Sequence, residues 1–177
     1  MNEELIEKIN IDTEKSKPSE FLFKELMTNL GYRCYDATKN QNMKEHWDVL
    51  AVKDTERGSI FKRIDVKSNK ESHKEGYTWV ELQNVRGDIG WLYSEEMDII
   101  AFERDDCFEL VMRDKLAIFI NERIVQADLE DENGNIVYQD KTNLGFYRRY
   151  RRGGRNDRTV KAPFSDFNGL IYKRIYK

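Results

Sequence analysis

The segment Trp47–Lys67, WDVLAVKDTERGSIFKRIDVK, decides the fold of this chain. Its first part contains an apolar run typical of a buried strand, and its second part is also strand-like. Residues 56–58, Glu-Arg-Gly, lie between the two parts and are typical of a turn. The segment is therefore predicted to form strands over 47–53 and 59–67, which we expect to pair as a hairpin.

Two carboxylates and a lysine are placed at one end of this hairpin. Because side chains alternate along a strand, Asp65 and Lys67 share one face, while Val66 turns to the other face, toward a core. Asp48 opens the first strand, and the start of that strand lies beside the end of the second in an antiparallel pair. We therefore expect Asp48 and Asp65 to meet at one end of the sheet.

Outward from the hairpin, helix-like and strand-like segments alternate along the chain. A helix is predicted from Pro18 to a C-terminal cap at Gly31, with an apolar stripe on one side. The segments that follow the hairpin are predicted as strands over 77–83, 97–103 and 107–112, a helical turn over 88–94, and a helix over 115–124 capped by Asp114. This order predicts an α/β protein with a mixed sheet.

Charge is distributed unevenly along the 177 residues, although the net charge is only −3. Residues 1–140 contain 19 Lys and Arg against 31 Asp and Glu, a net charge of −12. Residues 141–177 contain 11 Lys and Arg against 2 Asp and Glu, a net charge of +9. We therefore expect a core domain over 1–140, including an N-terminal helical segment, and a basic extension over 141–177 that packs on it with a hairpin around Gly153-Gly154.

The basic extension interleaves tyrosine with arginine. Arginine can bridge phosphates and tyrosine can stack on bases, so the extension is predicted to bind a nucleic-acid backbone. The alternative is a solvated hairpin whose arginines pair with the acidic core. The arginines assigned to backbone binding are Arg148, Arg149, Arg151, Arg152, Arg155 and Arg158.

Two carboxylates beside a lysine suit the chemistry of phosphodiester hydrolysis. Carboxylates that lie close together repel each other unless a cation or a proton intervenes. Mg²⁺ accepts carboxylate and carbonyl oxygens, keeps several waters, and lowers the pKa of a bound water. A neighbouring lysine can orient or deprotonate the attacking water, or stabilise charge in the transition state. The alternative is that Asp65 and Lys67 form a surface ion pair on an exposed strand.

These residues, taken in order, resemble the PD-(D/E)XK nuclease superfamily, and most of all its small Holliday-junction-resolvase-like and restriction-endonuclease-like members. The resemblance covers roughly residues 16–103. It depends on the motifs Pro18-Ser-Glu20-Phe, Asp48-Val-Leu-Ala, Ile-Asp65-Val-Lys67 and Glu81-Leu-Gln83. Trp47 occupies the place of the Pro in the family name, as other residues do in many members. The resemblance implies a restriction-endonuclease-like mixed central sheet flanked by helices.

The resemblance also implies a role for each matching residue. The implied metal ligands are Asp48, Asp65 and the carbonyl oxygen of Val66, and the implied catalytic residues are Lys67, Glu20 and Gln83. Glu20 would reach the metal directly or through water. The residues alone also allow Glu20 to be a carboxylate that favours a helix N-terminus, and Gln83 to be a plain strand residue.

The predicted function is a Mg²⁺-dependent endonuclease that cleaves DNA, with Mn²⁺ able to replace Mg²⁺. The alternatives are an inactive module that binds nucleic acid or protein, and an RNA-cleaving member of the superfamily. A homodimer is expected if both strands of a duplex are cut. Two cysteines give no disulfide framework, and the sequence has no long apolar run and no phosphate-binding loop. These features predict a cytoplasmic protein without a membrane span or a nucleotide cofactor.

Overall fold

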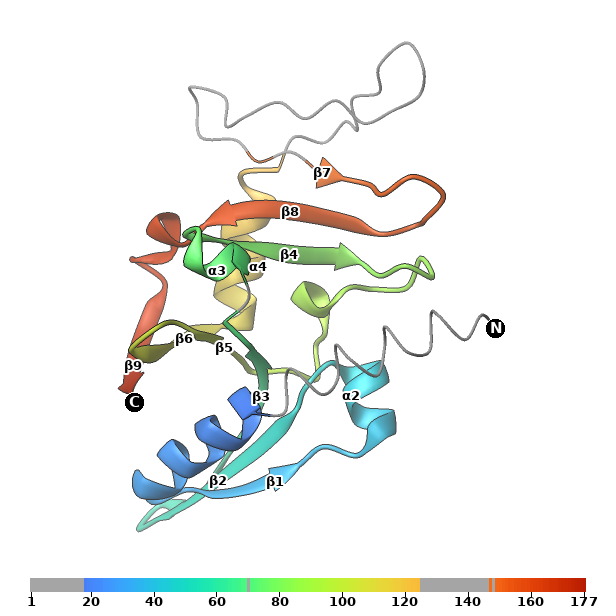
Figure 1. Cartoon of the computed structure of the whole chain (residues 1–177). Helices are drawn as coiled ribbons and strands as arrows, with labels where there is room; N and C mark the ends of the chain where they lie inside the picture. The colour runs from blue at the N-terminus through green and yellow to red at the C-terminus, as the bar shows by residue number, and fades with distance from the viewer. Residues whose placement is uncertain (1–17, 70, 125–146, 148) are drawn as a thin grey trace.

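The computed structural model describes residues 18–69, 71–124, 147 and 149–177, and it contains two β-sheets (Figure 1). The larger sheet has the strand order β1-β2-β3-β5-β6-β9, and the smaller has the order β4-β8-β7. Their strands are β1 Arg33–Asp36, β2 Val49–Thr55, β3 Gly58–Lys67, β4 Tyr77–Gln83, β5 Ile99–Glu103, β6 Cys107–Met112, β7 Arg149–Tyr150, β8 Arg158–Pro163 and β9 Ile171–Tyr176. The described chain is therefore α/β with a mixed central sheet, as predicted.

The helical elements are short. Residues 18–29 are helical and Gly31 follows with a φ of 83°, which agrees with the predicted helix and its cap. The other elements are α2 Lys39–Glu45, α3 Glu71–Lys74, the 3-10 turn η1 Trp91–Tyr93, α4 Arg113–Asn121 and the 3-10 turn η2 Phe164–Phe167. The residue that precedes α4 is Met112, so the predicted cap at Asp114 is wrong, and Asp114 lies in the first turn instead.

The predicted hairpin is present as β2 and β3. Its register runs from Val49 opposite Ile64 to Thr55 opposite Gly58. Gly58 adopts a φ of 113°, a conformation that glycine tolerates and that closes the turn. The hydroxyl of Thr55 donates to the carbonyl oxygen of Gly58 at 2.7 Å. Strand β2 begins at Val49, so Asp48 lies immediately before it.

The second neighbour of β3 is β5, which runs parallel to it with Lys67 opposite Phe102. Between these two strands the chain passes through α3, β4 and η1, as a parallel connection requires a crossover. Strand β4 has the predicted bounds, but it pairs with β8 in the smaller sheet. The turn η1, which lies within the predicted helical turn over 88–94, leads from β4 back to the central sheet.

Each face of the central sheet packs against a different layer. Helix 18–29 covers one face through Phe23 and Met27, which pack on Ile64 and Val66. The smaller sheet, η1, α4 and η2 cover the opposite face, where Phe102 is buried. Because Asp65 and Lys67 alternate with Ile64 and Val66, their side chains point to the face that the smaller sheet covers.

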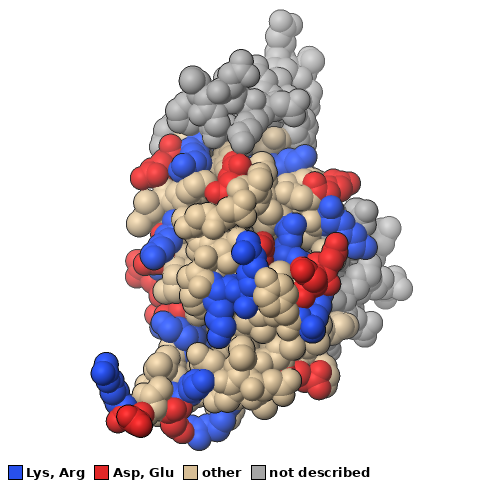
Figure 2. All heavy atoms as spheres, turned by 90° about the vertical axis from the view of Figure 1, so that its left-hand side faces the viewer, with Lys and Arg blue, Asp and Glu red and all other residues tan. Residues whose placement is uncertain are grey.

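The basic extension is part of both sheets. Strand β8 pairs with β4, strand β9 pairs with β6, and β7 and β8 form the predicted hairpin around Gly153-Gly154. Figure 2 shows that basic and acidic side chains are mixed on the face where β9 and the C-terminus lie. Two ion pairs of β9 and the C-terminal residue contribute to this mixture, Arg174 with Glu109 and Lys177 with Glu103, each at 2.9 Å.

Two parts of the sequence-based description lie outside the described residues. They are the N-terminal helical segment that precedes residue 18, and Arg148 of the basic extension. Among the helices that the structure describes, none is both long enough and apolar enough to cross a membrane.

Candidate active site

Asp48, Asp65 and Lys67 converge where β2 begins and β3 ends. The backbone N–H of Asp48 donates to the carbonyl oxygen of Ile64 at 2.9 Å, which places Asp48 beside β3. The ammonium of Lys67 lies 2.6 Å from Oδ2 of Asp65, and the Asp65 side chain is only 7% exposed. The structure therefore brings together the two carboxylates and the lysine that the sequence placed at one end of the hairpin.

The carboxylate of Asp48 is held on both of its oxygens. The backbone N–H of Val66 donates to Oδ2 at 2.8 Å, and the side-chain amide of Asn42 donates to Oδ1. Asn42 belongs to α2, a helix that the sequence analysis did not predict. Its signal was a capping box, in which Thr38 accepts from the backbone N–H of Gln41 and Gln41 accepts from that of Thr38. The box fixes the start of α2.

Lys67 lies between the carboxylates and an aromatic ring. Its ammonium is 4.9 Å from the ring centroid of Trp91, which is buried in η1. Burial alone would lower the pKa of Lys67, but the charges of Asp65, Asp48 and Glu81 outweigh it and raise the pKa. Lys67 is therefore protonated, which suits stabilisation of negative charge better than abstraction of a proton.

The site raises the pKa of the Asp48 carboxylate. Burial, with the nearby charge of Asp65 as the second cause, raises the pKa of Asp48 from 3.8 to about 7. The charge of Lys67 and the hydrogen bond from Val66 oppose this rise without cancelling it. The two neighbouring carboxylates repel each other, and the positive charge of Lys67 offsets this repulsion only in part.

The donor set fits a hard divalent ion. Mg²⁺ is usually held by one or two carboxylates and several waters, and Asp48 and Asp65 supply two. The N–H and C=O of one strand residue point to the same side of the strand. Because the N–H of Val66 donates to Asp48, the carbonyl oxygen of Val66 also points toward Asp48. Oδ2 of Asp65 is buried and faces the ammonium of Lys67 at 2.6 Å, so this oxygen already lies against a positive charge. Within the described ranges, no third Asp, Glu, His or Cys completes a metal-binding group.

The structure does not bring Glu20 into this group. Glu20 is half-buried on helix 18–29, which packs on the face of the central sheet opposite Asp65 and Lys67. The resemblance implied that Glu20 reaches the metal directly or through water; among the described residues, Glu20 forms no metal-binding group of three with Asp48 and Asp65.

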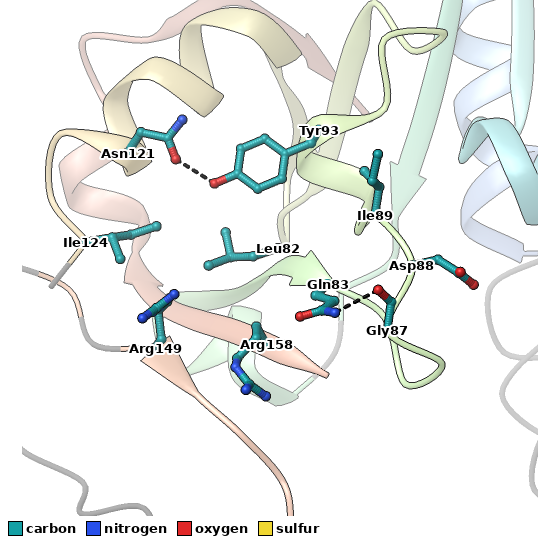
Figure 3. A pocket seen from close by; sticks show the side chains of 10 residues that line it. All are labelled: Leu82, Gln83, Gly87, Asp88, Ile89, Tyr93, Asn121, Ile124, Arg149 and Arg158. Atoms are coloured by element: carbon teal, nitrogen blue, oxygen red, sulfur yellow. Dashed lines mark hydrogen bonds between the residues drawn. The ribbon is translucent and has the colours of Figure 1, made fainter. Parts of the chain in front are cut away.

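The side chain of Gln83 is held by the loop that follows β4. Its side-chain amide donates to the carbonyl oxygen of Gly87 at 2.7 Å, and it lines a separate pocket (Figure 3). A register shift between Glu81 and Gln83 interrupts β4 at this point. Glu81, on the same strand, is the residue whose charge acts on Lys67. The resemblance implied a catalytic role for Gln83 and none for Glu81.

The arginines assigned to nucleic-acid binding fall into separate environments. Arg149 and Arg158 line the pocket that contains Gln83. Arg152 is bound to the buried carboxylate of Asp157 at 2.5 Å, so it anchors the hairpin. The Nε of Arg151 donates to the carbonyl oxygen of Arg155 at 2.9 Å, and the Arg155 residue itself is exposed. The arginine cluster is thus divided between the pocket and the hairpin turn.

The raised pKa of Asp48 gives a test in the metal-free protein. Because its pKa is about 7 in the folded chain and near 3.8 when unfolded, the folded state binds the extra proton. This stabilisation is complete below pH 4 and is lost as the pH rises through 7. When the pH is raised from 5 to 8, the free energy of unfolding of Asp48→Asn should therefore increase by about 1–3 kcal/mol relative to that of the wild type.

Urea unfolding in EDTA at both pH values measures this gain. The matched control is Asp54→Asn, an exposed carboxylate on β2, for which the difference from wild type should change little over the same range. A difference between Asp48→Asn and wild type that stays constant from pH 5 to pH 8 would contradict the raised pKa.

Comparisons with known proteins do not add a relative to this description. No family model matches the chain, and no curated protein or solved structure matches it. The function is therefore inferred from the residues and from their geometry.

Proposed function

We propose that the chain is a Mg²⁺-dependent endonuclease with a restriction-endonuclease-like fold that hydrolyses the phosphodiester backbone of DNA. The observation that carries the proposal is the convergence of Asp48, Asp65 and Lys67 at the junction of β2 and β3. The order of elements supports it further. A helix precedes β2, Asp48 lies immediately before that strand, and β3 ends in Asp65-Val66-Lys67. This is the order that the superfamily resemblance implies.

Each of these residues has a distinct task in the proposed reaction. Asp48 and Asp65 would hold the ion, with the Val66 N–H fixing the orientation of Asp48. When bound, Mg²⁺ supplies polarisation of the phosphate and a lower pKa for water. Lys67, protonated, would stabilise the charge that develops on the phosphoryl oxygens.

Trp91 prepares Lys67 for this task. Its ring centroid lies 4.9 Å from the ammonium, which is also 2.6 Å from Asp65, and the lysine side chain is only 29% exposed. A charge that is fixed before the reaction and shielded from water interacts more strongly with the transition state than a solvated one.

Cleavage assays with different nucleic acids test this function. Purified protein is incubated with supercoiled plasmid, single-stranded DNA and RNA, each with Mg²⁺, Mn²⁺ or EDTA. DNA cleavage with either metal and none in EDTA is expected. Cleavage of RNA alone would instead identify a ribonuclease, and binding of nucleic acid without any cleavage would identify an inactive binding module. The matched control protein is the double variant Asp65→Asn/Lys67→Met.

A further inference from the structure

A pocket of about 390 Å³ lies next to the candidate active site and has a composition of its own. It is formed by the smaller sheet, the loop that follows β4, η1 and the end of α4 (Figure 3). The residues that matter to its chemistry are Leu82, Gln83, Tyr93, Asn121, Arg149 and Arg158. Its volume falls in the range of about 300–1,000 Å³ that small-molecule sites occupy.

The pocket has a cationic side and an amide-bearing side. Arg149 and Arg158, from β7 and β8, lie together on one side, and Leu82 lies between them and Tyr93 (Figure 3). On the opposite side the hydroxyl of Tyr93 donates to Oδ1 of Asn121 at 2.5 Å. Burial raises the pKa of Tyr93 while the charge of Arg149 opposes the rise, so the guanidinium and the phenol are near neighbours.

This arrangement matches the parts of a nucleotide. Two guanidinium groups from adjacent strands suit a phosphate, which arginine binds through paired hydrogen bonds. Leu82, Ile89 and the Tyr93 ring offer an apolar surface for a planar base. Side-chain amides can pair with the polar edge of that base, and a base is available for such contacts only when it is unpaired.

The pocket and the carboxylate pair share two structural elements. On β4, Glu81 acts on Lys67 and Gln83 lines the pocket, and two strand residues span about 7 Å. On η1, Trp91 covers Lys67 and Tyr93 lines the pocket. On both elements, therefore, a residue near Lys67 and a residue of the pocket are only two positions apart, so one nucleic-acid strand can reach both places.

A third connection joins the two places through the loop before η1. Nε2 of His46 lies 3.2 Å from the carbonyl oxygen of Ile89, which lines the pocket. His46 is two residues before Asp48, and it ends α2 with a left-handed conformation, φ 58°. The pocket wall is thus tied to the segment that carries a metal-site carboxylate.

We propose that this pocket binds one unpaired nucleoside phosphate, with the phosphate between Arg149 and Arg158 and the base over Leu82. The pocket's position beside the carboxylate pair assigns that nucleotide to a polynucleotide, so the preferred substrate contains single-stranded or locally unpaired nucleic acid. This substrate class rests on the proposed nuclease function, whereas the binding of a nucleotide does not.

Binding assays without cleavage test the pocket separately from the active site. Fluorescence anisotropy in EDTA, with the Asp65→Asn/Lys67→Met protein, removes any dependence on catalysis. The probes are a blunt duplex, the same duplex with one extrahelical nucleotide, the same duplex with an extrahelical abasic site, a single strand, and free nucleoside monophosphates. The variant is Arg158→Gln, and the matched control is Arg155→Gln, which removes the same charge from the same hairpin outside the pocket.

The proposal expects the extrahelical nucleotide to bind at least about tenfold more tightly than both the blunt duplex and the abasic probe. Arg158→Gln should abolish this preference, and Arg155→Gln should weaken all probes equally while retaining it. Free monophosphates that bind as tightly as the single strand, and lose affinity in Arg158→Gln, would support the nucleotide site but overturn its assignment to a polynucleotide. Equal affinity for all duplex probes, or a preference that survives Arg158→Gln, would overturn the pocket proposal even if wild type cleaves DNA.

Discussion

Asp65→Asn and Lys67→Met are each expected to lower the rate of DNA cleavage by about 10²–10⁴-fold at saturating Mg²⁺. Asp65→Asn removes one of two carboxylates that can hold the ion, and an amide is a weaker ligand for a hard cation. Lys67→Met keeps an unbranched apolar side chain beside Trp91 but removes the charge that would stabilise the transition state. Single-turnover cleavage of a labelled DNA measures both effects.

A structural role for this ion pair can be separated from a catalytic one. Breaking a largely buried pair leaves one charge without its partner, so each single variant should also lose stability. The double variant removes both charges and should recover stability without recovering activity. Lys62→Met on β3 and Asp54→Asn on β2 are matched controls that should cleave at the wild-type rate. Full cleavage by both Asp65→Asn and Lys67→Met would exclude this site as the catalytic centre.

Phe102→Ala is expected to destabilise the fold by about 3–5 kcal/mol. Phe102 is completely buried on β5, where its ring centroid lies 5.4 Å from that of Phe164 and 5.9 Å from that of Phe167. It also packs against His73 and Trp91, so it joins the central sheet to the layer that covers it. Removing the ring leaves a cavity that rigid strands on both sides cannot close.

Urea unfolding followed by tryptophan fluorescence measures this loss. Phe61→Ala is the matched control, because Phe61 is 60% exposed on β3, and its free energy of unfolding should change by less than about 1 kcal/mol. Lys67 lies opposite Phe102 in the β3–β5 register, so the conformation of Lys67 should also loosen in Phe102→Ala. A loss below about 1 kcal/mol in Phe102→Ala would show that the two layers are not joined here.

The part of the candidate site that the sequence predicts is formed by residues close together in the chain. Asp48 and Asp65 are joined by one hairpin, whose turn and alternating strands fix the register from neighbouring residues alone. The prediction of β4 also has the right bounds, because a strand pattern depends on the residues of that strand. The pattern does not indicate which strand pairs with β4.

Which strand pairs with β4 depends on packing across the whole chain. It pairs with β8, which begins 75 residues after β4 ends, rather than with β3, to which it is much closer in the sequence. The parallel neighbour of β3 is β5, a strand with both faces buried. Short apolar strands suit several neighbours equally, so the choice depends on which combination buries both faces of the central sheet.

The sequence by itself determined the α/β class, the β2–β3 hairpin and the meeting of Asp48, Asp65 and Lys67, because these follow from local pattern and turn geometry. Only the tertiary structure decided that Trp91 covers Lys67, that Asn42 holds Asp48, and that Gln83 joins Arg149 and Arg158 in a separate pocket. The contacts of Trp91 and of the two arginines join residues far apart in the chain, so they exist only when the complete core is formed. Asn42 is only six residues from Asp48, but its contact depends on α2, which was not predicted.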